Sequence, residues 1–263
     1  MKLLNRPVGR LLFGIALIAL PVVAQNSEPA KAGLRNVVPG ANFDLSTFKL
    51  QLPIGSGSPL EIPPSQLTGD KGFTNDYFYT DATDGYAMTL MVPATGIAFK
   101  GSVHPRTEFH EVNPDGSDAS WATSGPNIMT ITEKVTQVPG HTAISQIFQA
   151  APAPSKPLCE LQYFSDGTVQ LLLEKTNKGG NTDLYRIGSV TPGSVYTYSI
   201  GLAGTTITVT LNGSSTNLEL PAAFVGEKFF FKFGNYDQTA KPGTPSAIPG
   251  TIVKIYALRV THK

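Results

Sequence analysis

The sequence predicts an all-β fold, a two-sheet antiparallel β-sandwich of jelly-roll type. Its 263 residues include 26 glycines and 21 prolines, which suits a chain with many tight turns. Only 15% of the residues are charged and 41% are hydrophobic, which excludes a coiled coil or a charged disordered chain. About a dozen segments alternate between apolar and polar residues, with no crossover helices between them. Two antiparallel sheets would bury one face of each such strand.

The first 24 residues have the pattern of a secretory signal peptide. Basic residues precede an apolar run over residues 11–23, and small residues follow up to Ala24. The alternative is an uncleaved membrane anchor, but the run contains Pro21 and is shorter than the ~20 residues of a spanning helix. We therefore expect cleavage after Ala24 and a secreted, extracellular protein.

Removal of the signal peptide changes the charge balance. Lys2, Arg6 and Arg10 are lost with no acidic residue, so the basic count falls from 20 to 17 against 19 acids and the net charge becomes −2. Without a global positive field, nucleic-acid binding is not expected. Residues 25–40 are expected to form a flexible leader and residues 41–263 a single domain. We expect a monomer that does not bind membranes once the signal is removed.

The alternation of residues justifies the strands in order along the chain. In the first strand, Phe48, Leu50 and Leu52 alternate with Lys49 and Gln51. Further strands are expected at residues 88–92, 106–112, 127–135, 142–150, 158–164, 168–174, 195–202, 205–211, 228–236 and 251–261, with short helical turns near residues 64–67 and 221–224.

The clearest hairpin follows residues 205–211. There Asn212-Gly213 supplies the positive φ angles that a type I′ turn needs. The same asparagine begins an Asn-Gly-Ser glycosylation sequon, so a glycan would sit on the turn.

The single cysteine is expected to be structural. With Cys159 alone, no intrachain disulfide can form, and it alternates with Leu161 and Tyr163 as a buried strand residue would. A nucleophilic thiol is the other interpretation, but no local motif supports it. Motifs for metal ligation, nucleotide binding and serine hydrolysis are missing from the sequence, so no metal and no cofactor are expected.

Polar residues on one predicted strand suggest a binding face. Arg106, Glu108 and His110 share one face of the strand, because alternate side chains point the same way. Arg106 could hold a carboxylate through two parallel hydrogen bonds. Taken alone, a solvated face with an ion pair is the more common explanation.

A second polar residue occurs in an apolar row. Gln146 lies between Ile144 and Phe148, which are expected on the same face of the strand. If this amide is buried, it must find hydrogen-bond partners. The alternative is an ordinary half-exposed glutamine.

The third segment is an aromatic strand that ends in polar residues. If the strand stays regular, Lys232, Gly234, Tyr236 and Gln238 share one face. Gly234 would let a ligand approach the backbone, and Tyr236 would stand in an open groove. Alternatively, this is a core strand that runs into a turn.

Together these segments resemble the motifs of polysaccharide lyase family 7, the alginate lyases. The resemblance rests on RTEFH at 106–110, QIF at 146–148 and FFKFGNYDQ at 230–238, and is supported by residues 43–53 and 78–81. The order and spacing of the motifs are similar to those of the family, and the similarity covers about residues 41–262. It implies a β-jelly roll with a substrate groove on one sheet, which agrees with the strand pattern.

The resemblance implies β-elimination on an anionic polysaccharide, a polyuronate, with no organic cofactor. The reaction removes the proton on C5 of a uronate and expels the oxygen on C4. Donors must neutralise the carboxylate as charge builds on C5, and the motif match gives that role to Arg106 and Gln146. Tyr236 is the implied proton-transfer residue. The remaining candidates are His110 at the catalytic centre, and Glu108, Lys232, Asn235 and Gln238 as substrate-binding residues.

The sequence departs from the family pattern at two positions. Phe148 stands where the family often has histidine, and His110 replaces an arginine. In guluronate the C5 proton and the C4 oxygen lie on opposite ring faces, whereas in mannuronate and glucuronate they lie on the same side. A single residue can serve as base and acid only in the second case. Keeping Tyr236 without the histidine therefore favours mannuronate-type links.

Two other functions stay open from the sequence. A lyase for glucuronan or another glucuronate polymer would use the same fold, and a carbohydrate-binding protein would keep the groove without catalysis. A glycoside hydrolase needs two suitably spaced carboxylates, and Glu108 and Glu111 cannot share a strand face.

Overall fold

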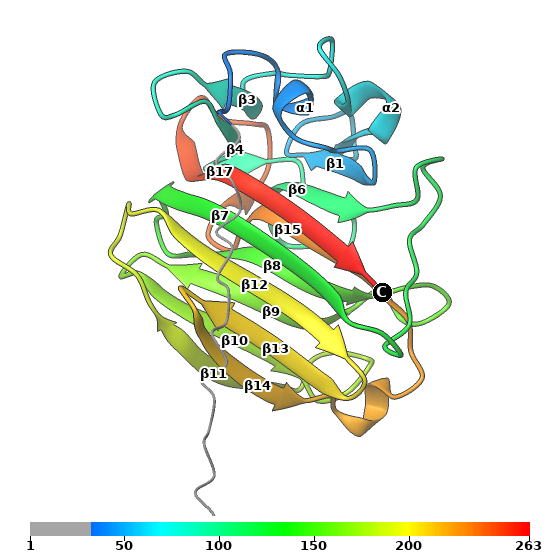
Figure 1. The fold of residues 1–263 in the computed structure, drawn as a ribbon. Coiled ribbons are helices and arrows are strands. Elements are labelled where there is room, and N and C mark those ends of the chain that lie inside the picture. Colours follow the sequence, from blue (N-terminus) through cyan, green and yellow to red (C-terminus); the bar gives the residue numbers. More distant parts are fainter. Residues whose placement is uncertain (1–32) are drawn as a thin grey trace, which may run out of the picture. The chain divides into compact units, whose positions relative to one another are not determined.

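A computed structural model describes residues 33–263 of the chain. The signal peptide expected at residues 1–24 lies outside the described residues. Two large sheets pack face to face as two layers (Figure 1), and every pair of neighbouring strands within them is antiparallel. The predicted all-β, two-sheet antiparallel sandwich is therefore confirmed.

We call the eight-stranded sheet the groove sheet and the seven-stranded sheet the outer sheet. In spatial order, the groove sheet contains β11 (Thr182–Ser189), β10 (Thr168–Glu174), β9 (Pro157–Phe164), β8 (His141–Gln149), β15 (Phe229–Asp237), β6 (Arg106–Glu111), β1 (Phe48–Leu52) and β2 (Leu60–Ile62). The outer sheet contains β14 (Ser214–Glu219), β13 (Thr206–Leu211), β12 (Tyr196–Ala203), β7 (Asn127–Gln137), β17 (Pro249–His262), β4 (Ala87–Pro93) and β3 (Phe78–Asp81).

Short elements complete the described part of the fold. They are the parallel pair β5 (Thr95–Gly96) and β16 (Lys241–Pro242), the helices α1 (Pro39–Asn42) and α2 (Pro64–Leu67), and the 3₁₀ turn η1 (Ala222–Phe224). The helical turns expected near residues 64–67 and 221–224 are thus present. No helix within residues 33–263 is long and apolar enough to cross a membrane.

The strands that the sequence did not predict are mostly at sheet edges. β2 and β11 form the two edges of the groove sheet, and β14 and β3 those of the outer sheet. Along β11 exposed side chains alternate with half-buried ones, none is fully buried, and the exposed set includes Leu184. An edge strand packs less apolar surface than a central one, so its alternation pattern is weak.

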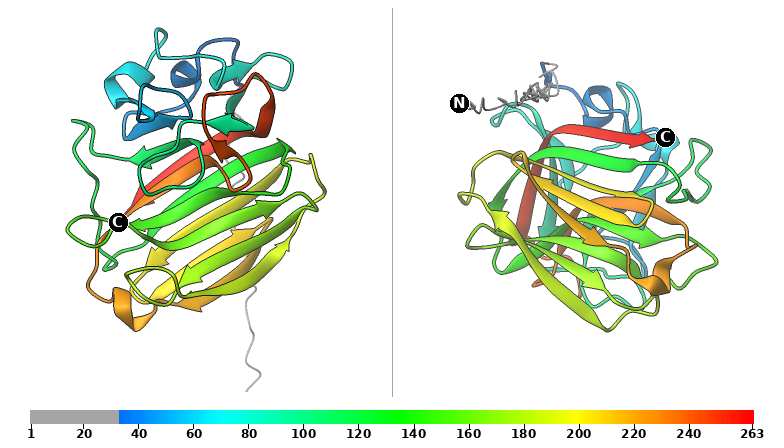
Figure 2. Two further views of the ribbon diagram at one scale, coloured as in Figure 1. Left: turned by 180° about the vertical axis from the view of Figure 1, so that it is seen from behind. Right: turned by 60° about the horizontal axis from the view of Figure 1, so that its bottom comes forward.

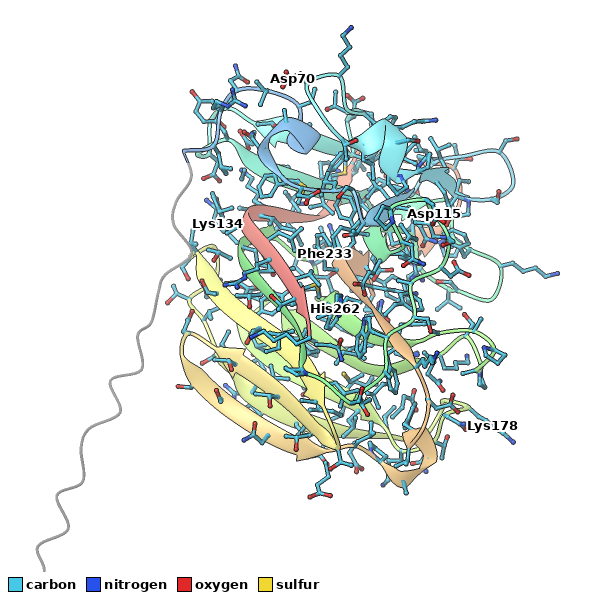
Figure 3. The ribbon with its side chains drawn as sticks, turned by 45° about the vertical axis from the view of Figure 1, so that its right-hand side comes forward. Asp70, Asp115, Lys134, Lys178, Phe233 and His262 are labelled. Atoms are coloured by element: carbon cyan, nitrogen blue, oxygen red, sulfur yellow. The ribbon has the colours of Figure 1, made fainter. Side chains whose placement is uncertain are left out.

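The interface between the sheets is the hydrophobic core. Phe48, Leu50 and Leu52 point into it as the alternation predicts. Next to them, Phe109 of β6 and Phe233 of β15 stack with ring centroids 4.8 Å apart. Figure 3 shows Phe233 between the two layers. These rings pack in the core on the inner side of β6 and β15, two of the strands that carry the polar motifs.

The turn between β13 and β14 is the predicted hairpin. Leu211 pairs with Ser214, and Asn212 and Gly213 have φ angles of 47° and 87°. Both positive angles fit a type I′ turn, in which Asn-Gly is preferred because these residues tolerate them best.

The described part of the expected leader is packed on the domain. Leu34 contacts the hydrophobic core, and Pro39 is buried at the start of α1. The Asn42 amide donates a hydrogen bond of 2.8 Å to the backbone oxygen of Arg35. The prediction of a flexible leader is therefore corrected for residues 33–40.

Cys159 occupies the buried strand position that its alternation predicts. Its side chain is fully buried between the sheets. Burial raises the pKa of the thiol to about 12, because the charged thiolate is disfavoured away from water. The thiol is therefore a packing group and not a nucleophile.

Candidate active site

The three polar motifs are far apart in the sequence but adjacent in the groove sheet. β15 lies between β8 and β6, and the view from behind in Figure 2 (left) faces this sheet. Lys232 pairs with His110 on one side and with Gln146 on the other, and Tyr236 pairs with Arg106. Strand pairing therefore gathers six of the eight candidate residues on one face.

A buried carboxylate organises this face. The Oε2 atom of Glu108 accepts a hydrogen bond from Nη1 of Arg106 at 2.9 Å and lies 3.1 Å from Nε2 of His110. Its Oε1 atom accepts one from Nε2 of Gln146 at 2.6 Å. Glu108 is only 1% exposed, so it orients these three side chains. The expectation from the sequence that Glu108 itself binds substrate is therefore corrected.

Burial and neighbouring charges set the protonation states around Glu108. Burial alone would raise the pKa of Glu108, but the charges of Arg106 and Lys232 and the hydrogen bond to His110 hold that pKa well below its usual range. Burial and the Lys232 charge lower the pKa of His110 to about 3. His110 is therefore neutral near pH 7 and does not supply the positive charge expected of a protonated histidine.

Tyr236 stands beside the guanidinium of Arg106. The guanidinium carbon lies 3.7 Å from the centroid of the phenol ring, in a cation–π contact. The Tyr236 hydroxyl lies 3.0 Å from Oγ of Ser102, and the same Oγ accepts a hydrogen bond of 2.9 Å from Nη2 of Arg106. A positive charge is thus held over the phenol ring and a hydroxyl next to the phenolic oxygen.

Lys232 lies on the floor of the groove beneath an aromatic ring. Its Nζ atom lies 3.4 Å from the ring centroid of Phe148 and 5.6 Å from that of Phe230. Burial lowers the pKa of Lys232 to about 7, against the opposing effect of the Glu108 carboxylate. Phe148 therefore packs against a cation at the position where the sequence lacks the histidine of the family.

The polar end of β15 is not a regular strand. Its pairing with β8 shifts between Phe233 and Tyr236, and Gly234 has a φ angle of 132°. Asn235 lies on the face opposite Tyr236, as regular alternation requires, and there it is fully buried and its amide donates to the backbone oxygens of Leu90 and Thr251. The prediction that Asn235 contacts substrate is therefore wrong.

Gln238 also lies outside the cluster. It follows the end of β15, and its amide donates a hydrogen bond of 3.0 Å to the backbone oxygen of Tyr236. It supports the backbone of Tyr236 and does not line the groove.

A similar irregularity separates Ile144 from Gln146. The pairing of β8 with β9 shifts between Ala143 and Ser145. Ile144 consequently packs in the core, while Gln146 reaches Glu108 on the opposite face. The expectation that both residues share a face is corrected by this bulge.

The cluster lines an open groove of about 420 Å³. Its walls include Lys100, Ser102, Arg106, His110, Gln146, Phe148, Lys156, Glu160, Glu174, Lys232 and Tyr236. A smaller hollow of about 190 Å³ adjoins it and shares His110 and Phe148.

Sequence reasoning missed several groove residues. Ser102 comes from the loop before β6, and Glu160 from β9. Their side chains reach the groove because of loop conformation and strand order, which alternation patterns do not reveal. The one usable signal was in β9, where Glu160 and Gln162 alternate with the buried Cys159 and Leu161.

The chain is similar to proteins of known structure. A family model described as alginate lyase matches residues 43–262. A variant of alginate lyase A1-II′ superposes with a TM-score of 0.76 at 30% identity, over 87% of this chain and 100% of its own. The alginate lyase of Pseudomonas aeruginosa superposes with a TM-score of 0.75 at 28% identity, over 84% of this chain and 100% of its own. The alginate lyase of Corynebacterium sp. has a TM-score of 0.71 at 25% identity, over 87% of this chain and 100% of its own. A search of curated proteins found no match.

The sandwich, its polar groove and these similarities define the class as a polysaccharide lyase. The family model spans most of the domain, and the solved relatives are covered over their whole length. The chain belongs to the alginate lyase family, polysaccharide lyase family 7.

Proposed function

We propose that the protein is a secreted lyase that cleaves alginate by β-elimination, with a preference for mannuronate-type links. One observation carries this proposal. The phenol of Tyr236, the guanidinium of Arg106 and the amide of Gln146 face one groove, and the last two are tied to the same carboxylate, Glu108. Secretion rests on the signal-like pattern of residues 1–24.

The proposed reaction starts with charge neutralisation. Arg106 and Gln146 donate hydrogen bonds to the uronate carboxylate, so that negative charge developing next to it is stabilised. Because Glu108 holds both donors in place before substrate arrives, little reorganisation is needed during the reaction. Lys232, whose pKa is lowered to about 7, adds positive charge at the floor of the same groove when it is protonated.

Tyr236 then transfers the proton. Acting as the phenolate, its oxygen takes the proton from C5, the electrons of the C5–H bond form the C4–C5 double bond, and the bond from C4 to the glycosidic oxygen breaks. The proton passes from Tyr236 to the leaving oxygen, which restores the starting state. Arg106, which lies over the ring, supplies positive charge beside the phenolic oxygen during the transfer.

The preference for mannuronate rests on Phe148. A phenyl ring cannot accept or donate the proton, and the neighbouring His110 is bound to Glu108 at the floor. Tyr236 is then the only proton-transfer group proposed. One group can both remove the C5 proton and protonate the leaving C4 oxygen only where that proton and that oxygen lie on the same side of the ring.

The relatives support the choice of polymer. The similar structures are of alginate lyases, and one of them is a variant of alginate lyase A1-II′ in complex with substrate. That protein is 30% identical to this chain over 87% of its length. Glucuronan shares the required stereochemistry and is the natural second polymer to assay.

The experiment that tests the proposal measures ultraviolet absorbance of the unsaturated uronate product. Tyr236→Phe should abolish turnover of alginate and leave weak binding. Arg106→Ala should lose about 3 kcal/mol of transition-state stabilisation, a fall in kcat of more than 100-fold. Tyr256→Phe, which removes a hydrogen bond to Asp84 on the outer sheet, is the matched control and should stay active. An active Tyr236→Phe, or polymer binding without absorbance by the unaltered protein, would contradict the proposal.

A further inference from the structure

Phe148 lies at the boundary between the groove and the smaller hollow beside it. Phe148 and His110 line both spaces, so one space continues into the other. Gln146 pairs with Lys232 of β15, and Phe148 pairs with Phe230 two residues further along both strands. Two residues of a strand span about 6–7 Å, which is about the length of one sugar unit. A polymer whose uronate contacts Gln146 would therefore place a neighbouring sugar over Phe148.

The ring of Phe148 is fixed from one side. Nζ of Lys232 lies over it, 3.4 Å from the ring centroid, and the Phe230 ring packs beside it at 5.4 Å with a tilt of 48°. Phe148 is half-buried, and its exposed part borders the groove and the hollow. Because these contacts already hold the ring, a ligand that stacks on it costs little side-chain entropy.

The hollow next to this ring has a largely apolar lining. Methyl groups and two phenyl rings make up most of it, from Ala119, Ala150, Ala151, Ala153, Phe148 and Phe230. Its volume of about 190 Å³ is comparable with one sugar unit. Such a lining favours a ligand that turns an apolar face toward it, because both apolar surfaces then leave water.

The charged groups of the hollow match the polar groups of one uronate. Lys49 is on the groove face, since it pairs with His110, and its 3.4 Å contact with Glu61 is partly exposed, so it can meet a carboxylate. Asp118 is exposed and can accept hydrogen bonds from hydroxyls. Glu111 also lines the hollow, but it is buried and both of its oxygens have partners in the protein. The hollow therefore suits a uronate that has one apolar face.

Mannuronate and guluronate differ in the faces that they can turn toward a phenyl ring. In β-mannuronate the axial hydrogens on C1, C3 and C5 make one face of the sugar apolar. In α-guluronate both faces carry axial oxygens. An oxygen pressed against the ring of Phe148 would lose its hydration and gain no hydrogen bond of ordinary strength in return. Stacking on this ring is thus favourable for mannuronate alone.

We propose that Phe148 is a stacking platform that selects mannuronate in the hollow, as the neighbour of the uronate that is cleaved. The inference rests on the proposed function for the place of the cleaved uronate. It goes beyond that function because the selected sugar takes no part in proton transfer. Phe148 then has a binding role of its own, in addition to lacking a group that can transfer the proton.

Binding of short oligomers to an inactive variant tests the platform without turnover. NMR titration would give Kd values of Tyr236→Phe for tetramannuronate and tetraguluronate, and we expect the first to bind more tightly. Adding Phe148→Leu should weaken tetramannuronate binding about tenfold, because the apolar side chain stays but the ring is lost. Binding of tetraguluronate should not change, which also shows that the groove is intact. Phe148→Tyr keeps the ring and should bind tetramannuronate as Phe148 does.

The matched control is Phe164→Leu in the same inactive variant. Phe164 is half-buried and stacks on His141 with centroids 4.7 Å apart, and within residues 33–263 it borders neither the groove nor the hollow. This change should leave both Kd values as they are. Equal effects of Phe148→Leu on the two oligomers, or no effect on either, would overturn the inference. If the unaltered protein released no unsaturated product but kept the Phe148-dependent preference, the proposed lyase activity would be wrong and the platform would stand.

Discussion

At the scale of single residues, one hydroxyl connects the two groups that carry the proposed chemistry. Ser102 Oγ lies within hydrogen-bond distance of Arg106 Nη2 and the Tyr236 hydroxyl, and it donates to the backbone oxygen of His104 at 3.1 Å. A serine hydroxyl has one donor and two acceptor sites, and this arrangement uses all three. Ser102 is therefore a positioning residue for both Arg106 and Tyr236.

Removing this hydroxyl should impair catalysis more than binding. We expect Ser102→Ala to lower kcat about 10- to 100-fold with little change in KM, because Arg106 and Tyr236 lose their shared partner. Ser102→Thr keeps the hydroxyl and should restore most of the activity. Steady-state kinetics over a pH series would measure this, and the pH profile of kcat should shift in the alanine variant alone.

The control for this prediction is another serine that ties loop segments together. Ser246 bonds to Thr95 and Ile248 away from the groove, so Ser246→Ala should lose similar hydrogen bonds and keep kcat. If Ser102→Ala and Ser246→Ala had equal kcat values, Ser102 would have no positioning role.

At the scale of elements, β15 has an irregularity directly before Tyr236. Gly234 has a φ angle of 132°, and a Cβ atom there would lie 2.8 Å from both Leu90 Cδ2 and the backbone oxygen of Thr107. The glycine thus permits a close approach of β15 to β6 and the shift in register that precedes Tyr236.

Gly234→Ala should therefore cost both stability and activity. We expect the free energy of unfolding to fall by about 1–3 kcal/mol from backbone strain, with more from the clash. Chemical denaturation and kcat measurements would test this. Gly226→Ala is the control, since its φ angle is 86° but its Cβ would meet nothing within 4 Å. A variant of Gly234 as stable and active as that control would contradict the role of the bulge.

These elements also show what the sequence could and could not predict. Alternation placed Phe48, Leu50 and Leu52 in the core, and it grouped Arg106, Glu108 and His110 on one face, because both follow from the regular period of a strand. It failed at Ile144, where a bulge in β8 changes the period by one residue. It could not find Ser102 or Glu160, since their contacts depend on loop conformation and strand order.

At the scale of the whole molecule, an unusual carboxyl lies between the two sheets. Glu133 of β7 is fully buried, its Oε1 atom accepts a hydrogen bond of 2.5 Å from Tyr196, and its Oε2 atom has no partner among the described residues. Burial raises the pKa of Glu133 to about 8, so the carboxyl is neutral in the folded protein near pH 7.

This carboxyl should make the fold less stable as the pH rises. A pKa that is higher in the folded than in the unfolded state contributes stability at low pH, which is lost between about pH 4.5 and 8. The expected slope is about 1.4 kcal/mol per pH unit. Glu133→Gln should remove it, and the difference in unfolding free energy between the two proteins, measured by denaturation across this range, isolates the effect. A difference that stays constant with pH would show that Glu133 is not the source.

The sharpest test of the account as a whole compares two polymers under identical conditions. Initial rates of ultraviolet absorbance increase would be measured on polymannuronate and on polyguluronate blocks of matched length. With Tyr236 as base and acid and Phe148 unable to transfer a proton, we expect faster turnover of polymannuronate. Equal or faster turnover of polyguluronate would contradict it.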